Sequence, residues 1–208
     1  MERFALNFPD SLKGIDFNTI EESKHTIYVI DRELKIIYVN EAWVNFAIDN
    51  QGKEYLNNFV LGTSVLDAIS GDAVKLYYQN NYRNVLQTGK MWNQEYECSS
   101  PEEYRIFRQS TLSLKDGKGL CIINALAVHL PMHEKRKVES LLIEKEYRQA
   151  SGFITQCSNC RQVQRVDKPD VWDWLPQWVE KVPKNMSHSF CAHCYDYHWK
   201  YGSLKYDS

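Results

Sequence analysis

Long apolar runs, an excess of one charge, and repeated or low-complexity segments are all missing from this chain. No hydrophobic stretch approaches the roughly 20 residues that a transmembrane helix needs. The formal net charge is only −2 over 208 residues, so it offers no attraction to nucleic acid or to an anionic membrane. The N-terminus lacks the basic and apolar regions of a secretory signal peptide. We therefore expect a cytoplasmic protein without a membrane partner, and the balanced charge disfavours nucleic acid as a partner.

Catalytic signatures are missing as well. The sequence contains no nucleophile elbow, no phosphate-binding loop and no paired-carboxylate motif. It also has no histidine-kinase core, receiver, cyclase or chemotaxis module. We therefore expect that the protein is not an enzyme.

What the chain does have is two Cys-x-x-Cys pairs, Cys157–Cys160 and Cys191–Cys194, with thirty residues between them. Each pair can bring two thiolates to one cation, and two pairs complete the tetrahedral sulfur site of a structural zinc ion. The alternatives are disulfides or redox-active thiols, and an iron–sulfur cluster. Without a secretion signal, paired cysteines favour a metal over disulfides. Zinc bound by these four cysteines is the prediction.

Three histidines near the second pair, His188, His193 and His198, complicate the ligand set. Each could replace a cysteine, but a histidine beside the site or at the surface is the more common case. We place His188 and His193 next to the metal ligands. Tryptophans in this part of the chain are expected to form a small core around the metal; they are Trp172, Trp174, Trp178 and Trp199.

The first 131 residues alternate between strand and helix signals. Two runs rich in β-branched residues, 26–30 and 34–39, form a predicted hairpin. Asn40 is a good N-cap for the helix that follows, and a longer helix is expected over 73–88. Three more strands are expected at 92–98, 104–114 and 119–130, the last two joined by a tight turn. Two strands, then helices, then three strands indicate an α+β domain with a five-stranded antiparallel sheet and helices on one face.

The predicted organisation has four parts. They are an N-terminal flanking segment over 1–24, the α+β domain over 25–131, a connector helix over 132–150 and a small zinc-binding module over 151–208. The connector is rich in Glu, Lys and Arg, and its narrow apolar stripe consists of Val138, Leu141 and Leu142. A stripe of this kind is compatible with a homodimer contact or with packing against the chain's own sheet.

The α+β part resembles a PAS domain. The resemblance is carried by Ile27-Tyr-Val-Ile-Asp31, Ile36-Ile-Tyr-Val-Asn40 and Gly62-Thr-Ser64. The whole chain is similar to small bacterial PAS proteins with a Cys-x-x-Cys…Ser-His-x-x-Cys-x-x-Cys tail, which here ends in Ser187-His-Ser-Phe-Cys191-Ala-His-Cys194. The resemblance covers about residues 25–200.

PAS membership implies a sensor or interaction module with an interior pocket, but no particular ligand. The side chains expected around that pocket are Tyr28, Trp43, Phe46, Tyr78, Tyr82 and Phe107; a simple packed core is the alternative. The resemblance implies a signalling protein that senses a small ligand or docks a partner, with the zinc module contacting another protein. Two other functions remain open, a zinc finger that binds nucleic acid and a zinc–thiol redox switch.

Overall fold

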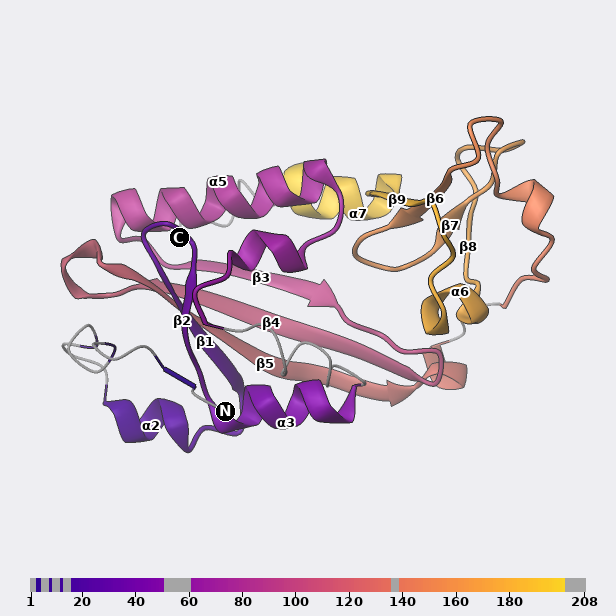
Figure 1. Ribbon diagram of the computed structural model, residues 1–208. Coiled ribbons are helices and arrows are strands. Elements are labelled where there is room, and N and C mark those ends of the chain that lie inside the picture. The colour runs from indigo at the N-terminus through magenta and orange to yellow at the C-terminus, as the bar shows by residue number, and fades with distance from the viewer. Residues whose placement is uncertain are drawn as a thin grey trace. The chain divides into compact units, whose positions relative to one another are not determined.

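The computed structural model describes residues 3–4, 8, 12, 16–50, 61–135 and 139–200, apart from the side chains at 116, 135, 199 and 200 (Figure 1). Contacts divide the chain into two compact units, each assembled from three segments. The first comprises Met1–Ile69, Tyr77–Gln94 and Arg108–Ala125, and the second comprises Ser70–Leu76, Glu95–Phe107 and Leu126–Ser208. No helix in the described part of the chain is long and apolar enough to span a bilayer.

The predicted five-stranded sheet is confirmed. Its strands lie in the order β2-β1-β5-β4-β3, and their bounds are β1 Thr26–Asp31, β2 Ile36–Val39, β3 Trp92–Glu97, β4 Glu103–Ser113 and β5 Gly119–Pro131. β1 lies antiparallel between β2 and β5, with Thr26 opposite Asn124 and Asp31 opposite Gly119. A Cβ at Gly119 would lie 2.2 Å from the carbonyl oxygen of Ile30, so the close approach of these strands requires glycine.

The two predicted helices are present as α3 (Glu41–Asp49) and α5 (Asp72–Thr88). The structure also has helix α2 (Phe17–Glu21) and the 3-10 turn η1 (Val65–Ala68). α5 ends where Gly89, at φ 69°, donates its N–H to the carbonyl of Val85. Its tyrosines pack on the sheet through Trp92 of β3, whose ring centroid lies 5.7 Å from that of Tyr77 and 5.8 Å from that of Tyr82.

The flanking segment covers the opposite face of the sheet. Phe8 and Ile20 belong to one buried cluster with Ile27 and Val29 of β1, whereas Tyr28, between those two, reaches Tyr82 of α5. Successive strand residues point to opposite faces, so both faces of β1 are covered. The ring of Phe8 is stacked on that of Tyr38 at 4.5 Å.

The side chain of Asn40 connects α2, β1 and α3 through hydrogen bonds. It is fully buried, and its Oδ1 accepts hydrogen bonds from the N–H groups of Ile27 and Trp43. Its Nδ2 donates to the carbonyls of Ile20, Ser23 and His25. One side chain therefore caps α3, as the sequence predicted, and also fixes the chain between α2 and β1.

The second unit has its own four-stranded sheet, in the order β8-β7-β6-β9. Its strands are β6 Ile154–Cys157, β7 Val163–Gln164, β8 Trp172–Asp173 and β9 Met186–Ser189, and its short helices are α6 Pro176–Glu180 and α7 Ala192–Tyr195. A cluster of Tyr147, Ile154, Val163, Leu175 and Trp178 is buried against it. β6 and β9 pair in parallel, which places Cys157 opposite Ser189.

The connector-helix prediction is wrong for the residues described. At the described positions of this segment, 132–135 and 139–150, the helical elements are the 3-10 turns η3 (Met132–Lys135) and η4 (Glu144–Glu146). The N–H of Ser140 donates to the carbonyl of Trp174, and Tyr147 is fully buried. Tertiary contacts thus override the helical composition of the segment. Leu142 packs against the buried cluster and Leu141 is exposed, while Val138 lies outside the described residues.

Replacing Asn40 by alanine should lower the free energy of unfolding by about 3 kcal/mol, because several buried backbone groups lose their partner at once. Chemical denaturation measures the change. Asn50→Ala is the matched control: its Nδ2 also bonds a helix carbonyl, that of Phe46, but at an exposed site, so a loss below about 1 kcal/mol is expected. Equal losses in the two variants would contradict the role given to Asn40.

Candidate metal centre

The four cysteines of the two Cys-x-x-Cys pairs meet in the second unit. All four side chains are buried, and their sulfur atoms lie within 4.8 Å of one another. None of them forms a disulfide. Among the described residues this cluster contains cysteines only, so no histidine takes the place of a predicted ligand.

Each pair sits on a tight turn that aims two sulfurs the same way. After β6, the N–H of Arg161 donates to the carbonyl of Cys157 at 3.0 Å, and Arg161 itself has a φ of 60°, in the left-handed region. In the second pair Cys191 is the N-cap residue of α7, and the N–H of Tyr195 donates to its carbonyl at 2.8 Å. Parallel pairing of β6 with β9 brings the two turns together.

The spacing fits a tetrahedral metal ion. Zinc–sulfur bonds of about 2.3 Å place tetrahedral sulfurs about 3.8 Å apart, and the sulfurs of Cys160 and Cys191 are separated by 3.8 Å. Hydrogen bonds from Cys160, and then from Cys191 and Cys194, lower the pKa of Cys157, whereas the contact with Cys157 raises the pKa of Cys160. The thiols alone thus favour one thiolate over its neighbours, and a divalent cation would supply the charge that ionises them all.

Two N–H donors are aimed at the sulfurs. The backbone N–H of Cys191 points at the sulfur of Cys157 at 3.4 Å, and Nδ2 of Asn159 points at the sulfur of Cys194 at 3.3 Å. Such bonds offset the negative charge that a four-thiolate site carries. The sequence-based prediction did not include Asn159. Its place inside the Cys157-Ser-Asn-Cys160 turn was the available signal.

The first turn is also bonded to the connection between β3 and β4, which belongs to the same unit. Oδ1 of Asn159 accepts the N–H of Glu97 at 3.0 Å, and Nη1 of Arg161 donates to the carbonyl of Ser99 at 3.0 Å. Arg105 adds a bond from its Nε to the carbonyl of Cys98. Asn159 therefore touches both a sulfur of the cysteine cluster and the backbone at the end of β3.

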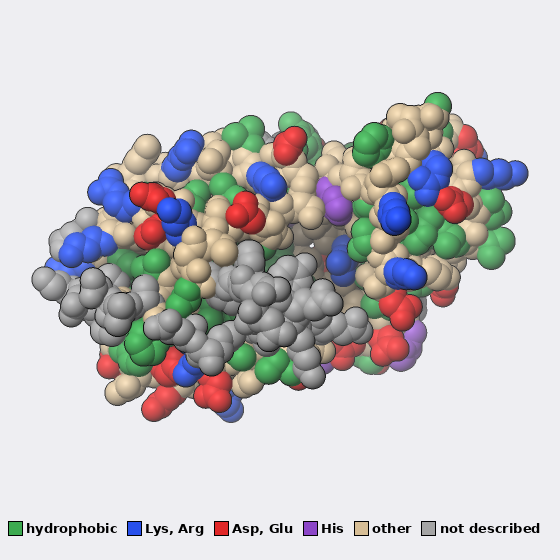
Figure 2. Space-filling model, viewed as in Figure 1, with side chains coloured by type: hydrophobic (Ala, Val, Ile, Leu, Met, Phe, Trp, Pro, Cys, Tyr) green, Lys and Arg blue, Asp and Glu red, His purple; other side chains and the backbone are tan. Residues whose placement is uncertain are grey.

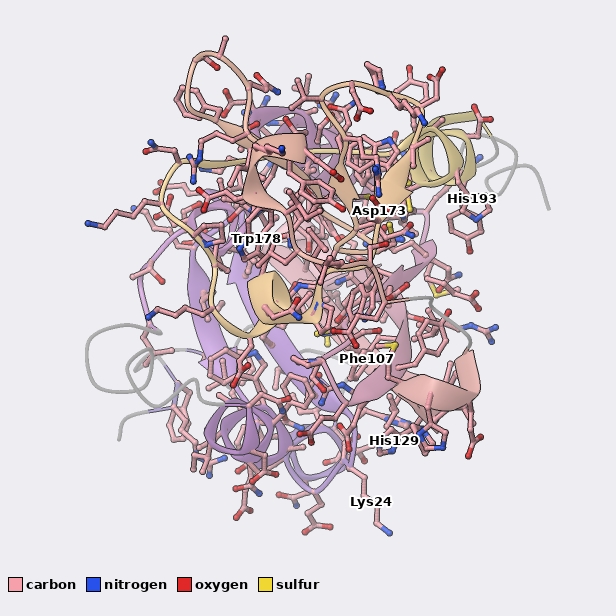
Figure 3. The ribbon with its side chains drawn as sticks, turned by 90° about the vertical axis from the view of Figure 1, so that its right-hand side faces the viewer. Lys24, Phe107, His129, Asp173, Trp178 and His193 are labelled. Atoms are coloured by element: carbon pink, nitrogen blue, oxygen red, sulfur yellow. The ribbon has the colours of Figure 1, made fainter. Side chains whose placement is uncertain are left out.

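The two histidines predicted beside the metal lie in different settings. His188 is on β9, half-buried, and its pKa is lowered by burial and by the nearby Arg161 cation. It packs against Gly71, where a Cβ would come within 2.9 Å of the Cβ of His188. His193 is exposed on α7 (Figure 3).

Of the tryptophans predicted to surround the metal and described in the structure, Trp172 alone packs against the cysteines. Trp172 packs on the cysteine cluster together with Phe190. Trp174 and Trp178 belong to the two other buried clusters of this unit. The side chain of Trp199 lies outside the described residues.

The residues predicted for the PAS pocket are distributed over both units. The hydroxyls of Tyr28 and Tyr82 share a hydrogen bond of 3.1 Å. The ring centroids of Tyr78 and Tyr82 lie 5.8 Å apart. Trp43 and Phe46 are half-buried on α3. Phe107 is in the second unit, stacked on Tyr96 at 5.7 Å. The pocket assignment remains a prediction for these six residues.

Replacing Asn159 by alanine should weaken Zn²⁺ binding by about 10- to 100-fold, because a sulfur loses its donor and the turn loses its bond to β3. Competition with a chromophoric zinc chelator measures the affinity. Ser158→Ala, in the same turn, removes only an exposed contact of 3.4 Å with the carbonyl of Ser70 and should leave the affinity unchanged. Equal affinities of the Asn159→Ala variant and the wild type would show that the amide has no such role.

Comparison with protein-family models gives no match, and neither does comparison with curated proteins. Solved structures match about half of the chain. The phage VqmA–DPO complex is 17% identical with a TM-score of 0.38, over 52% of this chain and 50% of that one. The PAS domain of a Colwellia psychrerythraea protein is 14% identical with a TM-score of 0.35, over 52% and 91%. A PAS domain from a two-component sensor histidine kinase is 14% identical with a TM-score of 0.31, over 52% and 90%.

The chain thus spans half the length of the VqmA protein that it matches. Its own elements define the fold: two strands, then helices, then three strands, assembled into one five-stranded antiparallel sheet. The α+β part of the chain has a PAS-like fold, joined to a module that carries a four-cysteine cluster.

Proposed function

We propose that the protein is a sensor or regulator in which the PAS-like part binds a small ligand or docks a partner. The cysteine cluster is a structural zinc site whose module contacts another protein. Signal output then depends on association with that partner, and the role is not catalytic.

The observation that carries this proposal is the set of bonds between the first cysteine turn and the β3–β4 connection. Asn159 and Arg161 hold the backbone of Glu97 and Ser99. Four cysteine ligands leave no open position for water, so a zinc ion here would hold the turn in place and activate no substrate. A metal held by this turn would be coupled to the end of β3 through these hydrogen bonds, which suits a module that responds to changes in that strand.

Charge favours a protein as the partner over nucleic acid. Residues 151–208 contain seven Lys or Arg against six Asp or Glu. On the face shown in Figure 2, basic and acidic side chains are mixed. Binding to phosphates needs a concentrated basic surface.

Metal analysis of the purified protein tests the proposed site. We expect about one zinc ion per chain, bound without added metal. Cys157→Ser should lose most of it and lower the stability of the protein, because the binding energy of a structural zinc is also folding energy. Cys98→Ser is the control, since Cys98 is outside the cluster. Finding iron, or disulfides between the pairs in the reduced protein, would refute the zinc assignment.

The partner can be a second copy of the chain. Leu141, from the predicted apolar stripe of the 132–150 segment, is 79% exposed, so its side chain is accessible to an apolar contact with a second copy. We expect sedimentation of the wild type to report a homodimer at tens of micromolar, and Leu141→Glu to shift it toward the monomer. Leu76→Glu is the control at another exposed leucine. A monomeric wild type would rule out the dimer.

A further inference from the structure

A row of buried amide side chains crosses three strands of the PAS-like sheet. Nε2 of Gln94 in β3 donates to Oε1 of Gln109 in β4 at 2.9 Å. Nε2 of Gln109 donates in turn to Oδ1 of Asn124 in β5 at 3.1 Å. All three side chains are at least 95% buried. Amides are rare in a core that apolar residues could fill, so this row requires an explanation.

The row lies on the sheet face that α5 covers. Gln94 is two residues after Trp92, so both side chains point to the same face, and Trp92 packs on Tyr77, Tyr78 and Tyr82 of α5. Thr111, two residues after Gln109, is on this face as well and is fully buried. Every one of these residues belongs to the first unit.

Two buried oxygen atoms on this face have no partner within the described part of the chain. They are Oε1 of Gln94 and Oγ1 of Thr111. Leaving a buried polar atom without a hydrogen bond costs roughly 1–3 kcal/mol. Valine and methionine would fill the same volumes without that cost. Polar groups retained at the expense of stability are typical of binding sites.

The buried polar groups that the first unit contributes to this face, as named here, are neutral. They are primary amides, the Thr111 hydroxyl and the phenols of Tyr28 and Tyr82. Burial raises the pKa of Tyr28 to about 12, because it outweighs the hydrogen bond to Tyr82, which by itself lowers that pKa. The phenol therefore stays protonated at neutral pH. A charged ligand would have no counter-charge among these groups, and burying it would be costly.

We propose that Gln94 and Thr111 form the recognition site for a small neutral molecule carrying an N–H or O–H donor. This inference rests on the proposed sensor function and names the chemical class of its ligand. The donor bonds Oε1 of Gln94, and the hydroxyl of Thr111 completes the contact. Because each amide of the row is held by the next, Gln94 presents its oxygen in a fixed direction. The aromatic residues on the same face favour a flat molecule.

Side-chain amide NMR of the full-length protein tests this with paired probes. The pairs are uracil with 1,3-dimethyluracil, nicotinamide with N,N-dimethylnicotinamide, and 2-pyridone with N-methyl-2-pyridone. We expect at least one N–H member to shift the Nε2 signals of Gln94 and Gln109. Its N-methyl counterpart should bind about tenfold more weakly, because its methyl groups cannot donate to the buried oxygen. Thr111→Val should weaken the binding of that N–H member.

The stability of the Thr111→Val variant also shows whether the Thr111 hydroxyl serves ligand binding or only the stability of the fold. In the ligand-free protein the variant should raise the midpoint of thermal unfolding, because it removes an unpartnered polar atom. Ser110→Ala is the control: the Ser110 hydroxyl bonds Oδ1 of Asn93, so its loss should lower the midpoint.

Three outcomes would overturn the ligand assignment. The first is a lower midpoint in Thr111→Val, which would mean that a buried water satisfies the hydroxyl. The second is equal binding of the N–H and N-methyl members of each pair. The third is no shift of the Gln94 and Gln109 signals with any probe. Zinc content, measured in parallel, distinguishes a failure of the sensor proposal as a whole from a failure at this site, since the metal is bound in the other unit.

Discussion

Four thiols whose sulfurs lie within 4.8 Å of one another can all be deprotonated only if a cation lies among them, and the second unit is organised around that constraint. Its regular elements are short: β7 and β8 have two residues each, and α6 has five. Its apolar clusters are small, with four or five buried side chains apiece. Cores of that size seldom hold a module together without a metal or a crosslink.

The cysteine module also contacts the ends of strands β3 and β4. Tyr104 of β4 is buried with Met132, Trp174 and Val179, and Asn159 connects the sulfur of Cys194 with the backbone of Glu97. The strand ends therefore share their packing and their hydrogen bonds with the cysteine module. We expect a metal-free protein to lose order in these strand ends together with the cysteine turns, because the two share hydrogen bonds and buried contacts.

The parts that the sequence predicted are those with a local signal. Runs rich in β-branched residues located β1 and β2, Asn40 located the start of α3, and the Cys-x-x-Cys spacing located the cluster. The connector failed because composition alone favoured a helix, whereas Ser140 and Tyr147 are fixed by distant residues. The role of Asn159 and the row from Gln94 to Asn124 depend on which strands become neighbours. Pairing of that kind has no short-range signature in the sequence.

Parallel pairing of β6 and β9 has a consequence for how the chain folds. The two halves of the cluster are separated by thirty residues, 161–190, and closing a loop of that length costs about 3 kcal/mol of chain entropy. An ion bound first by Cys157 and Cys160 would then be available to Cys191 and Cys194. Binding of the second pair would close the loop and offset this entropy cost. Folding of this unit would then accelerate with metal concentration, whereas the local hairpins of the five-stranded sheet would form at a rate independent of it.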